Sequence, residues 1–208
     1  AAAVAAARAR LAPGGRTGTT EVDGASLFIH VVRPHAFDVV LFGNGHVGRA
    51  LVQVLGALPC RVRWIDEREH DFPATVPDNV EIVATDAPAA EVADAPRGAY
   101  VVVMTHSHDL DFDIVEAALE RHDWAYLGLI GSKPKRAQFE RRLAARGAPE
   151  TDLARVTCPI GAQSGLSSKE PGAIAVGVAA EMLGVRERLR AASESSTVRA
   201  LPRRQERT

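Results

Sequence analysis

From residue 37 onward, the hydrophobic positions of this chain follow two alternating patterns. Apolar runs occupy residues 39–42, 61–65, 80–83, 99–104 and 124–130. Around these runs, apolar residues recur at helical spacing within 47–55, 114–119 and 139–144. Strands that are apolar on both faces, separated by amphipathic helices, are typical of a parallel sheet that is covered on both sides. The pattern therefore predicts an α/β fold with a doubly wound, mostly parallel sheet and helices on both faces.

Two shorter parts lie outside this alternation. Residues 1–36 contain an Ala-rich helix over 1–10, whose packing partner we expect to be missing, and a strand-like run at 26–32. Because the chain begins with Ala instead of Met, we expect it to be a fragment. Because the apolar residues of 1–10 and 26–32 would otherwise lack cover, we expect a homodimer. Residues 185–208 are rich in arginine and lack sustained periodicity, which predicts a disordered tail, with a docking arm as the alternative.

The main domain is predicted to span residues 37–184 and to end on a buried helix. Ser167 and Glu170 fit a capping box, with Ser167 as the N-cap and Glu170 as the third helical residue. Gly184 can end this helix, because glycine readily adopts the left-handed conformation of a helix C-terminus.

The most specific motif in this domain is a glycine-rich turn. Residues Gly43 to Gly48 read Gly-Asn-Gly-His-Val-Gly between the first apolar run and a helix predicted from His46 to about Leu58. Such a turn lets a phosphate approach the backbone, while the helix N-terminus supplies free N–H groups. Asp66 ends the next run, at the position of the acid that contacts a ribose in dinucleotide-binding folds. The sheet is therefore predicted to be Rossmann-like, and the turn either binds a phosphorylated ligand or only permits tight packing.

Four loops with polar side chains follow predicted strands or precede predicted helices. They cover residues 43–46, 105–109, 131–135 and 158–170. Because ligands of open parallel sheets bind beyond the carboxyl ends of the strands, we expect these loops to lie along one rim. Of the 25 basic residues only Lys133, Lys135 and Lys169 are lysines, and all three fall in these loops. They either bind an anion or are ordinary surface charges.

Two of these loops leave alternatives open. His106 and His108 can ligate a metal or hydrogen-bond a ligand, or their loop can be purely structural, with Asp109 as the N-cap of the next helix. Cys158 can be a nucleophile or a soft ligand, although a buried, inert thiol is the commoner case.

Charge and composition exclude several classes of function. The net charge of −1 gives no electrostatic case for nucleic acid or an anionic membrane as partner. No stretch reaches the roughly 18–20 apolar residues of a membrane span. The two cysteines, Cys60 and Cys158, form neither a disulfide framework nor a zinc-site spacing, so a cytoplasmic protein is predicted.

Taken together, these motifs resemble the XdhC family of xanthine dehydrogenase accessory proteins, which are molybdenum cofactor chaperones. The matching segments are Leu41–Leu51, Trp64–Arg68, Phe72–Pro73, Met104–Asp111, Tyr126–Arg136, Cys158–Gly161 and Ser168–Val176. Two features depart from the family pattern. Asn44 stands where the family often has Ala, and residues 1–36 lack the paired-cysteine motif that is common in the N-terminal domain of the family.

The resemblance implies a cytoplasmic chaperone and not a turnover enzyme. It implies that the chain binds and protects the molybdenum cofactor (molybdopterin), supports its sulfuration with a cysteine desulfurase, and delivers it to the xanthine dehydrogenase apoenzyme. The cofactor-binding residues indicated by the family and by the loops are Gly43, Gly45, His46, Gly48, Asp66, Thr105, His106, His108, Ser132, Lys133 and Lys169. Asp66 also allows a bound dinucleotide, and no catalytic residue or metal ligand is predicted.

Two other functions fit the same motifs. An NAD(P)-dependent oxidoreductase needs a proton donor beside the hydride site and a dedicated substrate region. The chain has little mass beyond the Rossmann-like core from which to build that region. A regulatory module would bind a dinucleotide but no molybdenum.

Overall fold

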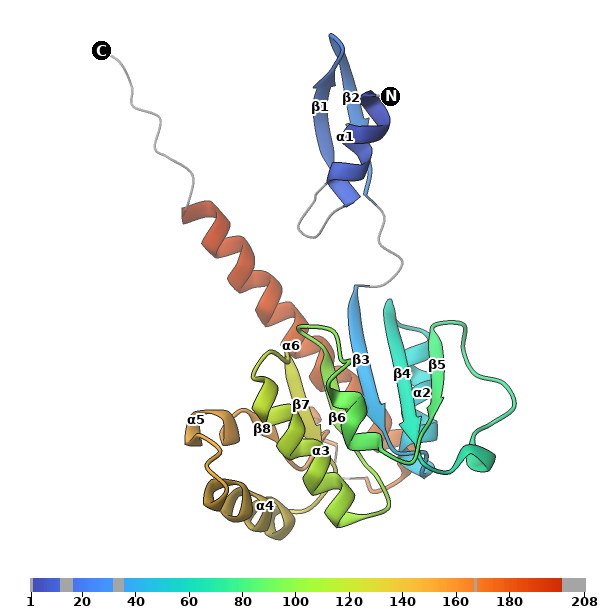
Figure 1. Cartoon of the computed structure of the whole chain (residues 1–208), viewed down its shortest axis with the longest axis vertical. Coiled ribbons are helices and arrows are strands. Elements are labelled where there is room, and N and C mark those ends of the chain that lie inside the picture. Colours follow the sequence, from blue (N-terminus) through green and yellow to red (C-terminus); the bar gives the residue numbers. More distant parts are fainter. Residues whose placement is uncertain (1, 12–16, 32–35, 167, 200–208) are drawn as a thin grey trace. The chain divides into compact units, whose positions relative to one another are not determined.

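The computed structural model describes residues 2–11, 17–31, 36–166 and 168–199 (Figure 1). The chain divides into two compact units, Ala1–Pro34 and His35–Thr208. Each unit is described by itself.

The smaller unit is a β-hairpin with a helix against it. Strands β1 (Gly18–Val22) and β2 (Ala25–Ile29) pair antiparallel through a two-residue turn at Asp23 and Gly24, whose φ angles of 53° and 79° match the twist of a hairpin. Helix α1 (Ala2–Leu11) lies against the hairpin, and Arg10 Nη2 donates to the Thr19 carbonyl at 3.1 Å. The expectation that this helix lacks a partner is therefore wrong, because the unpredicted strand β1 completes a hairpin for it.

A six-stranded parallel sheet forms the centre of the larger unit (Figure 1). Its strands are β3 (Phe37–Phe42), β4 (Cys60–Asp66), β5 (Val80–Ala84), β6 (Tyr100–Val103), β7 (Tyr126–Leu129) and β8 (Val156–Thr157). The strand order is β5-β4-β3-β6-β7-β8, and every neighbouring pair is parallel. The order reverses between β3 and β6, as in doubly wound nucleotide-binding folds. The predicted fold class is confirmed.

Two hydrophobic cores, one on each face of the sheet, hold helices against it. Because side chains alternate along a strand, Val40 and Phe42 of β3 belong to one core and Val39 and Leu41 to the other. The first core includes α3 (His108–Arg121), α4 (Lys133–Ala145) and α5 (Glu150–Leu153), and the second includes α2 (His46–Gly56) and α6 (Pro171–Arg199). Short helical turns at Glu69–Asp71, Pro88–Val92 and Ala162–Ser164 complete the connections.

Helix α6 begins later than predicted. Its first residue is Pro171, and the Glu170 carbonyl accepts from the Ile174 N–H at 3.0 Å, so Glu170 is the N-cap and not the third helical residue. Proline favours this start, because its fixed φ suits the first turn and its missing N–H would have no helical partner there. The predicted N-cap, Ser167, lies outside the described residues.

Helix α6 also ends later than predicted. It passes Gly184 and continues to Arg199, so the prediction of a disordered tail is wrong over 185–199. Gly184 does not take the positive φ that ends a helix, and Val185 and Arg186 continue the packing, the latter with its guanidinium 5.3 Å from the Phe37 ring centre. Residues 200–208 lie outside the described residues. None of the described helices is long and apolar enough to cross a bilayer.

Candidate functional site

The loops that carry the predicted site residues meet at the carboxyl edge of the sheet. Because β3, β4, β6 and β7 are parallel neighbours, the residues that follow them emerge on the same side, at the lower edge of the larger unit in Figure 1. The strand order reverses between β3 and β6, and ligands of such folds bind at this point.

Two of the three motif glycines are required by packing. Gly43 has a φ of 116°, and a Cβ atom there would overlap the Met104 carbonyl oxygen. A Cβ atom on Gly48 would overlap the Gly43 carbonyl oxygen, which also accepts a hydrogen bond from Trp64 Nε1 at 3.0 Å. Both positions therefore fit the interpretation that the glycines allow close contact between β3, α2 and the loop after β6.

Gly45 has no such packing role. It is the N-cap of α2, with an ordinary φ of −79° and no side-chain cap, and an added Cβ atom would meet nothing within 4 Å. The first helical hydrogen bond runs from the Arg49 N–H to the Gly45 carbonyl at 3.0 Å, so the preceding N–H groups of the first turn have no acceptor in the helix. An uncapped helix N-terminus with no side chain at Gly45 suits an anion.

Asp66 is a buried anchor for the glycine turn. Its Oδ2 accepts from the Asn44 N–H at 2.6 Å and from Arg68 Nη2 at 2.9 Å. Its Oδ1 accepts from the Arg68 N–H at 3.0 Å and from Arg68 Nε at 2.9 Å. Burial by itself raises the pKa of Asp66, but the hydrogen bonds from Arg68 and Asn44 together lower this pKa below its ordinary value. The carboxyl group is therefore charged and fully engaged inside the chain.

Asn44 is the polar residue of the turn that sequence reasoning left without a role. Its side chain is 2% exposed, and its Oδ1 accepts from Arg49 Nε at 3.1 Å. Its Nδ2 is one of the buried side-chain atoms that have no hydrogen-bond partner within the described part of the chain. Arg49 also donates to the Asp71 carbonyl, so the turn is tied to the segment after β4.

The loop of residues 105–109 carries His106 and His108 and is called the twin-histidine loop. It is held by Asp111, a residue without a predicted role. Asp111 Oδ1 accepts from the Thr105 N–H at 2.9 Å and from the Thr105 hydroxyl at 2.8 Å. Ser107 is the N-cap of α3, since its hydroxyl accepts from the Leu110 N–H, so the alternative that Asp109 caps this helix is wrong. The Thr105 side chain therefore stabilises the loop and is only partly exposed to solvent.

The two histidines of this loop lie on the surface. His106 Nε2 is 3.3 Å from Glu67 Oε1, so this contact joins the segments after β6 and β4 across the end of β3. His108 is the exposed first residue of α3. No group of three or more metal-ligating side chains occurs in residues 2–11, 17–31, 36–166 and 168–199.

The lysines divide into one buried and two exposed residues. Lys135 Nζ donates to Asp111 Oδ2 at 2.6 Å and to the Ile130 carbonyl at 3.0 Å, and it is 9% exposed. Lys133 is the exposed first residue of α4, which Ser132 caps by accepting from the Lys135 N–H at 3.4 Å. Lys169 is exposed shortly before α6. Lys133 and Lys169 remain available to an anion, whereas Lys135 fixes the loops.

Both cysteines are buried. Burial raises the pKa of the Cys158 thiol, and it raises the pKa of the Cys60 thiol to about 11. Because the thiolate is the nucleophile and the metal ligand, neither residue is poised for that chemistry at neutral pH. The alternative of an inert thiol is favoured for Cys158.

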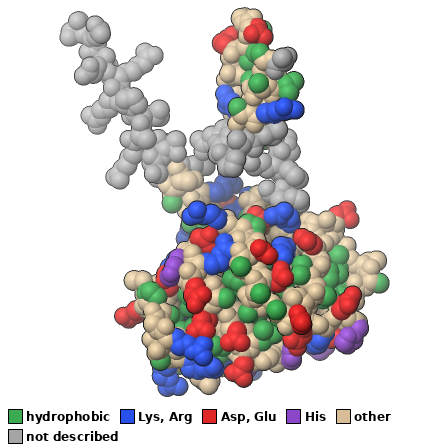
Figure 2. Space-filling model, in the orientation of Figure 1, with side chains coloured by type: hydrophobic (Ala, Val, Ile, Leu, Met, Phe, Trp, Pro, Cys, Tyr) green, Lys and Arg blue, Asp and Glu red, His purple; other side chains and the backbone are tan. Residues whose placement is uncertain are grey.

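The predicted site residues therefore divide into those that are exposed along the rim and those that position its loops. The exposed members are Gly45, His46, His106, His108, Ser132, Lys133 and Lys169. The remaining members, Gly43, Gly48, Asp66 and Thr105, are used to position the loops. In Figure 2, histidine side chains lie at the lower edge of the larger unit, where β3 and β4 end in Figure 1.

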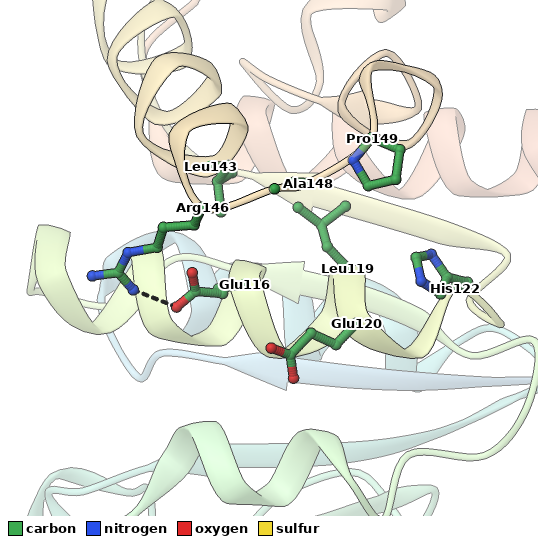
Figure 3. A pocket seen from close by; sticks show the side chains of 9 residues that line it. Glu116, Leu119, Glu120, His122, Leu143, Arg146, Ala148 and Pro149 are labelled. Atoms are coloured by element: carbon green, nitrogen blue, oxygen red, sulfur yellow. Dashed lines mark hydrogen bonds and ion pairs between the residues drawn. The ribbon is translucent and has the colours of Figure 1, made fainter.

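A separate hollow of about 150 Å³ lies between the last turns of α3 and α4 and the start of α5 (Figure 3). Its apolar lining includes Leu119, Leu143 and Pro149, and the ion pair between Arg146 and Glu116, 2.6 Å long, lies beside it. Because α3 and α4 begin at the rim, their last turns lie toward the opposite edge of the sheet. This hollow is therefore not part of the rim.

A family model described as the XdhC Rossmann domain matches residues 39–182, nearly the whole of the larger sheet and its covering helices. The chain belongs to the XdhC Rossmann-domain family. The resemblance seen in the glycine turn, the twin-histidine loop and the lysine loops is confirmed by this match.

Two proteins similar to this XdhC-family chain extend the comparison. The uncharacterized protein YqeB of Escherichia coli (strain K12) is 30% identical over 161 residues, which make up 76% of this chain and 28% of YqeB. A crystal structure described as a xanthine dehydrogenase from Bacillus halodurans is 24% identical with a TM-score of 0.58, over 73% of this chain and 43% of that one. The chain thus spans less than half the length of either protein, and the structural likeness supports the fold.

Proposed function

We propose that this XdhC-family chain is the cofactor-holding domain of a cytoplasmic accessory protein for xanthine dehydrogenase. Its cargo would be the molybdenum cofactor, which it holds and passes on without turning over a substrate. The observation that carries this proposal is the N-terminus of α2, where no side chain caps the helix and a Cβ atom on Gly45 would meet nothing within 4 Å.

The chemistry of the rim fits such a cargo. A pyranopterin cofactor carries a terminal phosphate, which needs backbone N–H groups and positive charge, and a polar fused ring, which needs hydrogen-bonding side chains. Gly45 would seat the phosphate at the start of α2, and the exposed Lys133 and Lys169 would supply charge. His46 and His108 are exposed and can donate to or accept from the ring.

Family membership supports the role and the partners that we assign. The recipient would be the xanthine dehydrogenase apoenzyme, and a cysteine desulfurase would supply sulfur while the cofactor is held. A homodimer is also proposed, since Val4 and Phe28 of the smaller unit are more than half exposed. The absence of a reactive thiol among the described cysteines agrees with holding, because neither Cys60 nor Cys158 favours the thiolate.

The test is retention of the cofactor by purified protein. We expect the wild-type chain, mixed anaerobically with molybdenum cofactor, to carry molybdenum and pterin through gel filtration. Gly45→Leu should lose most of both, because its side chain fills the space that the phosphate needs, and the fold should persist, because an added Cβ atom there meets nothing.

The matched control is Gly184→Ala, a glycine substitution in α6 whose Cβ atom meets only the end of the flexible Arg188 side chain. It should retain molybdenum and pterin as the wild type does. Wild-type protein that elutes free of both would overturn the proposal, and equal retention by Gly45→Leu would move the site away from the glycine turn.

A further inference from the structure

The carboxylate of Asp66 has no acceptor position left for a ligand. An ionised carboxylate offers about four acceptor positions, two on each oxygen. Oδ1 is taken by the N–H and Nε of Arg68, and Oδ2 by Nη2 of Arg68 and the N–H of Asn44. The Arg68 guanidinium is held in turn by Asp71, whose Oδ2 lies 3.3 Å from Nη1.

This carboxylate is also closed off from solvent. Asp66 is 4% exposed, whereas the Arg68 side chain is 31% exposed. The guanidinium therefore lies between the carboxylate and solvent. In dinucleotide-binding folds the acid at this position accepts the hydroxyl groups of a ribose. Here the Arg68 guanidinium donates to both oxygens of that acid.

We propose that Arg68 is a specificity-determining residue that blocks the ribose-binding position of this fold at the Asp66 carboxylate. This position is called the ribose seat. The rim then selects a phosphorylated ligand that presents no ribose diol at the end of β4, and it rejects nicotinamide and other adenine dinucleotides. This inference deepens the proposed function and rests on it for the identity of the cargo. The exclusion of dinucleotides rests on the geometry of Asp66 and Arg68 alone.

Removing the Arg68 side chain should open the seat in a defined way. One acceptor position becomes free on each oxygen of Asp66, which matches the two hydroxyl groups of a vicinal diol. The Asn44 N–H and the Arg68 backbone N–H would still hold the carboxylate in place. An Arg68→Ala variant is therefore expected to gain affinity for a dinucleotide that the wild type rejects.

The experiment is a titration of the full chain with NADH, followed by nicotinamide fluorescence and by calorimetry. We expect no saturable binding by the wild type at up to millimolar NADH, and a gain of at least about tenfold in affinity for Arg68→Ala, the value of one hydrogen bond to a charged group. Arg68→Lys keeps the charge but cannot bridge both oxygens, so it should gain less and serves as the readout if Arg68→Ala does not fold. Arg61→Gln, which removes an exposed partner of Asp38 from the other end of β4, is the control and should behave as the wild type.

Saturable NADH binding by the wild type would overturn the inference, as would a folded Arg68→Ala that gains none or, if Arg68→Ala does not fold, an Arg68→Lys that gains none. These outcomes are distinct from failure of the proposed function. A wild type that retains molybdenum and also binds NADH would refute only the closed seat. A wild type that retains no molybdenum, beside an Arg68→Ala that gains NADH binding, would refute only the assigned cargo.

Discussion

Individual side chains at the rim divide into those that hold the loops and those that are free to meet a ligand. Lys135 and Asp111 are the strongest example of the first kind, since both are buried and their charged atoms are 2.6 Å apart. Their contact joins the first turns of α3 and α4, and Asp111 also fixes Thr105. A buried ion pair is sensitive to loss of one partner, because the other is left as an uncompensated charge.

We predict that Lys135→Met lowers the free energy of unfolding by roughly 3 kcal/mol, since Asp111 would remain buried without its cation. Asp111→Asn combined with Lys135→Met should recover most of this loss, because the amide oxygen can still accept from Thr105. Lys133→Met, which removes an exposed lysine two residues away, is the control and should change stability little. Urea denaturation measures all three, and a single Lys135→Met variant as stable as the wild type would contradict this role.

The sequence could not assign these residue roles. Lys133, Lys135 and Lys169 share the same kind of loop, and only the packing distinguishes the buried Lys135 from the other two. Arg68 lies two residues past Asp66, in the segment Trp64–Arg68 that resembles the XdhC family. Nothing in this spacing indicates that its guanidinium donates to the Asp66 carboxylate. Such contacts depend on side-chain orientation, which sequence spacing does not determine.

At the scale of elements, the turn from β3 into α2 combines close packing with an uncapped helix N-terminus. Gly43 and Gly48 lie where backbone atoms of neighbouring segments approach closely, whereas Gly45 faces open space. The same substitution should therefore cost much more stability at Gly48 than at Gly45.

We predict that Gly48→Ala lowers the free energy of unfolding by more than about 2 kcal/mol, because its methyl group overlaps a backbone carbonyl that cannot easily move. Gly45→Ala should cost at most about 1 kcal/mol, because its methyl group meets nothing within 4 Å and only the N-cap preference for Gly over Ala is lost. Thermal or urea unfolding of both variants checks this, and equal losses would mean that the turn is packed differently.

Elements with strong patterns were predictable and short or atypical ones were not. The apolar runs became β3 to β7, and in the inner strands β3, β6 and β7 burial on both faces demands apolar residues throughout. The two-residue strand β8 and the polar strand β1 carry too little pattern to be recognised. The sequence pattern places the end of α6 too early, at Gly184, because this glycine stays helical and Val185 still packs against the core.

At the scale of the whole larger unit, strand order brings distant parts of the sequence to one edge. The glycine turn, the segment after β4 and the twin-histidine loop follow three adjacent strands, and the His106–Glu67 contact joins the outer two across the middle one. The rim as a place was predictable from the alternation of strands and helices. Which rim residues would face a ligand was not predictable, because that depends on the conformation of the loops.

The central claim is that a phosphorylated pterin cofactor binds at the start of α2. Hydrogen–deuterium exchange of the wild-type chain, with and without molybdenum cofactor under anaerobic conditions, tests this claim most directly. We predict that the cofactor slows exchange of the backbone amides of residues 45–49, with smaller effects at 105–108 and 131–135. Unchanged exchange at 45–49 in the presence of bound cofactor, or protection confined to the hollow between α3 and α4, would contradict it.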